Sequence, residues 1–174
     1  GKPVIAAVNG YCIGGGNELN LLCALTIATE KSIFGRAGPR IGSVPIWFGT
    51  QLLTLNLGEK RAREIVYLCR QYTARQALEM GWINAVVPEP EFDATVNQWC
   101  QEILEKSPQA LRLAKFSINC EADRLISSVN QGFHALTLFY GTEEFREGCS
   151  AFVEKRKPDF RRFRAGKTLG EKER

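Results

Sequence analysis

Short apolar runs dominate the first part of the chain, and each ends at glycine or polar residues. Residues 3–8 (PVIAAV) are typical of a buried strand, because the run is continuous and stops at an Asn-Gly pair. Residues 25–30 and 32–37 predict two further strands, and residues 82–88 predict a fourth. This part of the chain is therefore expected to contain most of the β-structure.

After Gly49 the apolar residues recur mostly at helical spacing. Thr73 is a candidate N-cap, and Ser107 followed by Pro108 supplies the N-cap and first residue of a later helix. An earlier, short helix is expected to begin near Gly15 or Gly16. The other predicted helices cover residues 58–72, 74–81, 91–106 and 109–119, and two more follow, the last of which begins near Thr142. Strands come first and helices last, which indicates an α/β protein.

Composition narrows the class of protein. The 174 residues suffice for one domain with a core, and the net charge is a modest +4. We expect no membrane span and no signal peptide, and the opening of the chain on an apolar run without Met suggests part of a longer protein. Six cysteines without metal-ligand spacing are expected to be reduced core residues, which favours a cytoplasmic protein and no metal site.

Three consecutive glycines, residues 14–16, are the most unusual local feature. Their spacing fits neither a dinucleotide fingerprint nor a P-loop, and no G-x-S-x-G accompanies the single histidine, His134. A strand-to-helix turn remains, whose exposed backbone N–H could stabilise an oxyanion beside the carboxylate of Glu18. The alternative is an ordinary helix N-terminus with a favourably placed acid, which local spacing alone favours.

The chain resembles the enoyl-CoA hydratase/isomerase (crotonase) superfamily in three successive stretches: KPVIAAVNGYCIGGGNEL, SIFGRAGPRIGSVP and GEKRAREIVYLCRQYTARQALEMGWINAVVP. The resemblance covers the second half of the family's domain and implies a crotonase (ClpP-like) fold of stacked β-β-α turns whose N-terminal part is missing. By this reading residues 1–95 belong to the spiral core and residues 96–163 to a helical trimerisation region. Residues 164–174 are expected to be a disordered tail.

The same resemblance implies a chemistry. Gly15 would donate one of two N–H groups that stabilise a thioester enolate, while the other donor would lie in the family's first half. Glu18 falls at the position of one of the two catalytic carboxylates of hydratases, and Gly38 stands where the second would be. Water addition by two carboxylates is therefore not expected.

A more specific resemblance is to 1,4-dihydroxy-2-naphthoyl-CoA synthase and to ring-opening oxocyclohexane- and oxocyclohexene-carbonyl-CoA hydrolases. Ser43 and Tyr140 match residues that contact the reacting end of the substrate in that branch. Pro45, Arg36 and Val66 depart from the synthase pattern, so bicarbonate is not expected. The combined pattern predicts hydrolytic C–C cleavage of a cyclic oxoacyl-CoA.

Further candidate residues follow from the resemblance. Arg36 could hold a substrate carboxylate or carbonyl or form a surface ion pair, and Trp47 could line an acyl pocket or pack in the core. Lys155, Arg156 and Lys157 could meet the phosphates of coenzyme A or form a solvated helix end. The predicted substrate-binding set is Gly14, Arg36, Gly38, Gly42, Pro45, Trp47, Lys155, Arg156 and Lys157. The coenzyme A thioester is the substrate in this account, and no permanently bound cofactor is expected.

Other functions stay open on the sequence. Glu18 alone could serve an enoyl-CoA hydratase or isomerase, and a synthase-like ring closure is a related alternative. A different class is a non-catalytic crotonase-fold protein that binds RNA or protein through KRKPDFRRFR, although the segment offers few aromatic residues for base stacking. The resemblance implies a homotrimer or hexamer, with no nucleic-acid or membrane partner.

Overall fold

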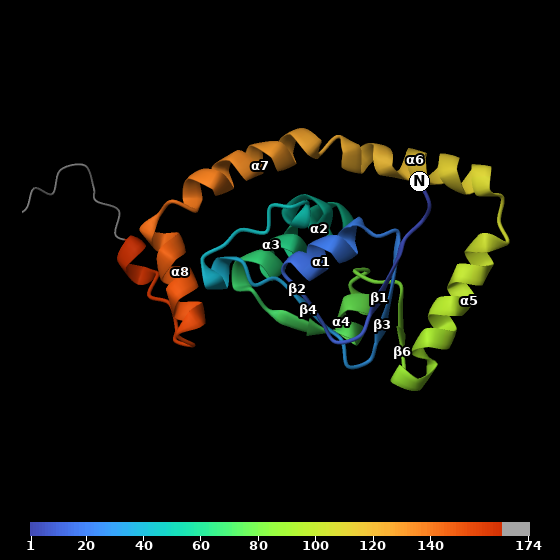
Figure 1. Ribbon diagram of the computed structural model, residues 1–174, viewed down its shortest axis with the longest axis horizontal. Coiled ribbons are helices and arrows are strands. Elements are labelled where there is room, and N and C mark those ends of the chain that lie inside the picture. Colours follow the sequence, from blue (N-terminus) through green and yellow to red (C-terminus); the bar gives the residue numbers. More distant parts are fainter. Residues whose placement is uncertain (165–174) are drawn as a thin grey trace, which may run out of the picture.

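A computed structural model describes residues 1–164, and these residues contain two small sheets (Figure 1). In the first sheet β1 (Ile5–Val8), β3 (Leu25–Thr29) and β6 (Ala85–Val87) lie parallel in the order β1-β3-β6. The second has the order β2-β4-β5, in which β2 (Tyr11–Ile13) pairs parallel with β4 (Ile33–Gly35). β5 (Gln71–Thr73) pairs antiparallel with β4.

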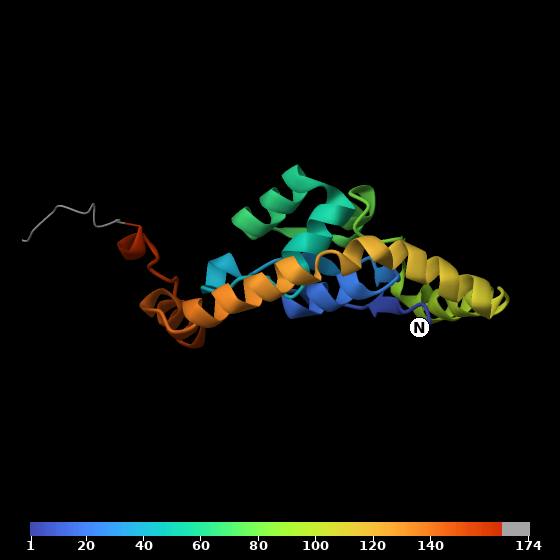
Figure 2. The same ribbon diagram turned by 90° about the horizontal axis from the view of Figure 1, so that it is seen from above.

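The helices form two groups. The helices α1 (Gly15–Leu22), α2 (Gly49–Leu57), α3 (Glu59–Leu68) and α4 (Ala74–Glu79) lie close to the sheets. The helices α5 (Phe92–Leu104), α6 (Pro108–Asp123), α7 (Ile126–Phe139) and α8 (Glu143–Val153) form an arc around them (Figure 1). Figure 2 shows that α6 and α7 run almost in line, while α2 and α3 project away from them. Short 3-10 turns occupy Pro39–Ile41 (η1), Glu89–Glu91 (η2) and Arg161–Phe163 (η3).

The core lies between the second sheet and the helices α1 to α4. Phe34 of β4 is fully buried, and its ring lies 5.9 Å from that of Trp82, which lies between α4 and β6; the ring of Tyr72 in β5 lies 6.1 Å from the same Trp82. Leu53 of α2 and Ile65 of α3 are also fully buried in this cluster. Burial of these side chains fixes β4, and β4 leads directly into the loop that carries Ser43.

The α/β class and most predicted elements are confirmed. Thr73 caps α4 in a complete capping box with Gln76, and Ser107 caps α6 with Pro108 at its first position. The predicted helix 58–72 is wrong at its end, because Cys69 adopts a left-handed conformation (φ 50°) and the next residues form β5. β2 was also missed, since a three-residue strand carries little periodic signal and exists through its pairing with β4.

The described residues also bear on the cysteines and on membrane-spanning helices. Cys12 and Cys69 are buried as predicted, but Cys120 and Cys149 are exposed, so the six cysteines are not all core residues; all six are free thiols. Over residues 1–164, no helix is both long and apolar enough to cross a membrane. The predicted tail lies outside the described residues, apart from Arg164.

Candidate functional site

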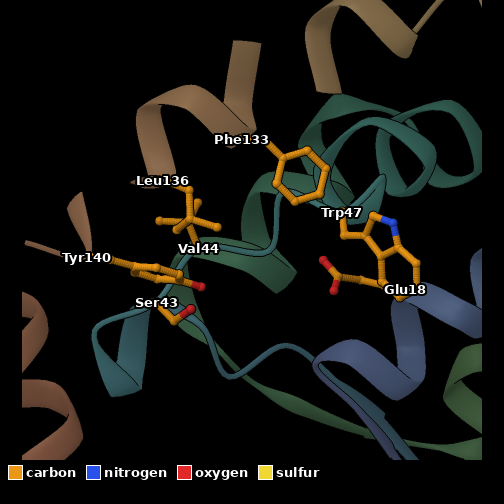
Figure 3. Close-up of a pocket in the computed structure, with 7 residues that line it drawn as sticks. All are labelled: Glu18, Ser43, Val44, Trp47, Phe133, Leu136 and Tyr140. Atoms are coloured by element: carbon orange, nitrogen blue, oxygen red, sulfur yellow. The ribbon is translucent and has the colours of Figure 1, made fainter. Parts of the chain in front are cut away.

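Several predicted site residues line one cavity of about 460 Å³. Glu18 comes from α1, Ser43 and Trp47 from the loop after β4, and Tyr140 from the end of α7. Figure 3 shows the Glu18 carboxylate pointing into the cavity beside Trp47, with Ser43 and Tyr140 on the other side. Val44, Phe133 and Leu136 complete the wall. The cavity is thus mainly apolar, with one carboxylate and two hydroxyl groups.

The glycine turn that precedes Glu18 has a conformation that demands glycine. Gly14 is the N-cap of α1 with φ 60° and ψ −125°, and its carbonyl accepts the N–H groups of Asn17 and Glu18 at 3.0 Å each. A Cβ built at Gly14, Gly15 or Gly16 would meet nothing within 4 Å, so the turn faces open space. The first helical residue, Gly15, has an N–H that precedes the helix's own hydrogen-bond ladder. The turn can therefore present a backbone donor to a ligand one helical turn away from Glu18.

Glu18 forms a buried ion pair with Arg36. The Arg36 Nη1 lies 3.4 Å from Glu18 Oε1, and Arg36 is only 1% exposed. Burial raises the pKa of Glu18 above its ordinary value, and this effect outweighs the Arg36 charge and the Trp47 backbone N–H, which both lower it. Burial also lowers the pKa of Arg36, against the opposing effect of Glu18. A carboxylate with a raised pKa is a stronger base and suits proton transfer.

The loop that carries Ser43 leaves no space for a second acid. The Ser43 N–H donates to the Gly38 carbonyl at 2.8 Å. A Cβ at Gly38 would lie 2.9 Å from the Ser43 carbonyl oxygen and 3.0 Å from Cδ of Pro45. Gly42, with φ 69°, lies against α8, where its own added Cβ would approach Gly148 Cα to 3.1 Å. Gly38, Gly42 and Pro45 therefore shape the loop and are not among the side chains that line the cavity.

The α7 wall was only partly found from the sequence. Phe133, Leu136 and Tyr140 are three and four residues apart, so they share one helical face, and this spacing was the signal available for the first two. The Tyr140 ring packs at 4.5 Å against that of Phe145 in α8. A Cβ at Gly132 would lie 2.4 Å from Ile46 Cγ2, so α7 approaches the Ser43 loop closely. The two walls of the cavity are thus in direct contact.

The predicted role of Arg36 in substrate binding requires correction. Its side chain is fully enclosed, and Nη1 and Nη2 donate to the carbonyls of Gly14 and Gly49 at 3.2 and 3.1 Å. The group lies behind Glu18 and outside the cavity lining, and its ion pair is buried, not on the surface. Arg36 therefore contacts the site's own residues.

The basic residues after α8 lie apart from this cavity. Arg156 and Lys157 line a second cavity of about 450 Å³, together with Arg40 and Phe160, whereas Lys155 does not. Arg156 is already bound by Glu147, with Nη1–Oε1 and Nη2–Oε2 distances of 2.6 and 3.1 Å. The Arg156 guanidinium is thus occupied by an ion pair. Lys157 and Arg40 are the other basic residues among the described lining of this cavity.

Comparisons with known proteins show which family this fold belongs to. The family model described as "Enoyl-CoA hydratase/isomerase" matches residues 1–163. The chain is similar to the crystal structure of an enoyl-CoA hydratase from Mycobacterium avium subsp. paratuberculosis K-10, with 30% identity and a TM-score of 0.87 over 91% of this chain and 65% of that one. It is also similar to a carnitinyl-CoA hydratase from Mycobacterium avium, with 32% identity and a TM-score of 0.85 over 90% and 62% of the two chains.

A third similar structure is a methylmalonyl-CoA decarboxylase in complex with 2-nitronate-propionyl-CoA. Its identity is 29% and its TM-score is 0.80, over 91% of this chain and 62% of that one. The chain thus spans slightly less than two thirds of the length of these structures.

Proposed function

The chain belongs to the enoyl-CoA hydratase/isomerase family, and on that premise we propose that it supplies the base and one oxyanion donor of an acyl-CoA-processing enzyme. The fold is the crotonase fold expected from the sequence. The observation that carries the proposal is the cavity in which Glu18 faces Ser43 and Tyr140, one helical turn from Gly15. Whole relatives are longer than this chain, so the reaction is proposed for the full-length protein.

The proposed reaction is hydrolytic C–C cleavage of a cyclic oxoacyl-CoA. Glu18 removes a proton from water, and the resulting hydroxide adds to the ring ketone to form a tetrahedral alkoxide. Ser43 and Tyr140 donate hydrogen bonds to this oxygen. Collapse of the alkoxide breaks the C–C bond and moves its electron pair into the thioester as an enolate. The proton held by Glu18 then reaches the α-carbon, so the product is a ring-opened acid that has gained one water.

The Gly15 N–H would stabilise the enolate oxygen. A backbone donor at a helix N-terminus is already oriented and carries partial positive charge, and such a donor contributes about 3–4 kcal/mol to the transition state of a dry site. The apolar Trp47, Phe133 and Leu136 would exclude bulk water around it. Lys157 and Arg40 in the second cavity would contact a phosphate of coenzyme A.

Hydration of an enoyl-CoA by Glu18 alone is the second candidate. It is supported by the similarity of this chain to an enoyl-CoA hydratase and a carnitinyl-CoA hydratase. The enclosed position of Gly38 weighs against the two-carboxylate form of that reaction. One carboxylate would then have to deliver both the hydroxide and the proton.

A substrate panel separates the candidates. We would incubate the full-length protein with 2-oxocyclohexanecarboxyl-CoA, 6-oxocyclohexene-1-carbonyl-CoA and crotonyl-CoA and follow the products by mass. A ring-opened acid supports the proposal, and E18Q should then slow its formation by about 10²–10⁴-fold, while E79Q on the exposed end of α4 should not. Hydration of crotonyl-CoA alone would replace the proposal with the hydratase.

We also propose that the α5–α8 region mediates a trimer. Large apolar side chains remain exposed on α6 and α7, including Phe116, Ile118 and Leu138. Exposed apolar surface of this kind is typical of interaction sites.

A further inference from the structure

The deepest charged group of the site is not the proposed base but the arginine behind it. Arg36 follows β4 directly and is 1% exposed, so its charge is almost fully removed from water. A buried guanidinium without compensation is strongly unfavourable, and its contacts therefore indicate why it is there. The guanidinium pairs with the Glu18 carboxylate and donates hydrogen bonds to the carbonyls of Gly14 and Gly49.

These three groups belong to different parts of the site. Gly14 is the turn residue whose peptide unit leads to the Gly15 N–H, and Glu18 is the acid one turn further along α1. Gly49 begins α2, directly after the cavity residue Trp47 and Phe48. The Arg36 guanidinium thus connects the glycine turn, the carboxylate and the Trp47 segment through one planar group.

The ion pair is long enough to leave the carboxylate free to take up a proton. The Nη1–Oε1 distance is 3.4 Å, and within the described residues Glu18 Oε1 has no hydrogen bond. A short bidentate contact would hold Glu18 permanently ionised, as the 2.6 and 3.1 Å contacts of Arg156 do for Glu147. The guanidinium stays in place because its best hydrogen bonds go to the two carbonyls.

Gly49 makes this arrangement possible. A Cβ at position 49 would lie 2.4 Å from Glu18 Oε1 and 2.7 Å from Arg36 Nη1. Any larger residue would therefore push the two charged groups apart. The ion pair between Glu18 and Arg36 thus depends on a glycine at the start of α2.

We propose that Arg36 is the positioning residue of this site: it orients the Glu18 carboxylate at the cavity and favours its charged form without preventing protonation, and it fixes the Gly14 carbonyl, while Gly49 leaves the space in which the pair forms. The inference rests on the proposed function in that Glu18 is the base. In the described part of the chain, the other groups around the carboxylate are the Trp47 N–H, the Tyr140 hydroxyl across the cavity, and Cys12 beside Arg36. Burial raises the pKa of the Cys12 thiol to about 11, so this thiol is neutral at pH 7.

The test measures the pKa of Glu18 itself and needs no substrate. In the full chain labelled with carboxyl-¹³C glutamate, the Glu18 resonance is assigned by its loss in E18Q and titrated in the wild type, R36K, R36M and G49A. Loss of the positive charge in R36M should raise the pKa of Glu18 by about 1–3 units, because an opposite charge within 4–6 Å has an effect of that size. R36K keeps a positive charge and should therefore leave the pKa of Glu18 close to the wild-type value. G49A should raise this pKa, because the added methyl group displaces the Glu18–Arg36 pair.

The outcomes are separable. A Glu18 pKa unchanged in G49A, and in R36M where that variant folds, would overturn the proposal, because a merely structural arginine would alter stability without moving this titration. If R36M does not fold, G49A still decides the result, because it displaces the pair without removing the charge. A shifted pKa in a protein that turns over no acyl-CoA would reject the proposed function and leave the role of Arg36 intact.

Discussion

Gly38 occupies the position at which the family resemblance would place a second catalytic acid, and the structure gives a physical reason for the glycine. Its Cβ position lies against the Ser43 carbonyl and the Pro45 ring, so the loop closes tightly at this residue. Among residues 1–164, Glu18 is the one carboxylate that lines the cavity. The single-acid chemistry proposed here is thus a consequence of local packing as well as of residue type.

This packing predicts that restoring the acid will not restore a hydratase. We expect G38E to lower the free energy of unfolding by about 1–3 kcal/mol, because overpacking forces the backbone of the loop to move. The matched control is G141E, where the added Cβ would meet only the Leu138 carbonyl at 3.6 Å. Urea unfolding of both variants checks the difference; equal stability together with new crotonyl-CoA hydration by G38E would contradict it.

At the scale of elements, the helices and strands that could be predicted are those with a local sequence pattern. N-cap residues and apolar spacing identified α4, α6 and α8, and the strands around Ala7 and Ile27 followed from continuous apolar runs. β2 and β5 were not predictable in this way, because each has three residues and forms by pairing with β4. Their existence depends on tertiary contacts, which override local propensity.

The residues of the candidate site likewise fall into those identified from the sequence and those that only the fold reveals. Glu18, Ser43 and Tyr140 were identified through motif resemblance, while Phe133 and Leu136 required the packing of α7 over the Ser43 loop. The Glu18–Arg36 pair also joins residues 18 positions apart with no periodic relation. Its partners could be assigned only once β4 had been placed next to α1 by the fold.

The helix α8 is tied to the segment after it by Glu147. This carboxylate accepts hydrogen bonds from Arg156 and from the Asp159 N–H, and these contacts lower the pKa of Glu147 to about 2. Its folded-state pKa is therefore below its unfolded value near 4.5. The stability that it contributes is complete above about pH 4.5 and is lost as the pH falls through about 2.

We expect E147Q to remove this acid-dependent stability. The wild type should become less stable between pH 4.5 and pH 2 by more than E147Q does, and E79Q should follow the wild type. Urea unfolding at a series of pH values measures this. Parallel curves for wild type and E147Q would show that the Arg156 contact does not contribute.

At the scale of the whole molecule, α5–α8 form an arc (Figure 1), and large apolar side chains on α6 and α7 are exposed. Phe116 and Leu138 are 69% and 80% exposed, which is a large apolar surface for a free monomer. We proposed above that this region forms a trimer, since burying such side chains contributes about 1.5–3 kcal/mol each.

The full-length protein is therefore expected to sediment as a trimer or hexamer. A double variant, F116D/L138D, should shift it toward the monomer, whereas K106D at an exposed position after α5 should not. Analytical ultracentrifugation distinguishes these results. A monomeric wild type at micromolar concentration would contradict the proposed role of the arc.

The central claim is that Glu18 carries a proton from water to the enolate carbon during ring opening. The most direct measurement is turnover of 2-oxocyclohexanecarboxyl-CoA by the full-length protein in H₂¹⁸O and, separately, in D₂O, with wild type and E18Q compared by mass spectrometry. The account predicts one ¹⁸O in the new carboxylate, one deuterium at the α-carbon, and a rate about 10²–10⁴-fold lower in E18Q. An ¹⁸O on the thioester-derived carboxylate with release of coenzyme A, or an undiminished rate in E18Q, would contradict it.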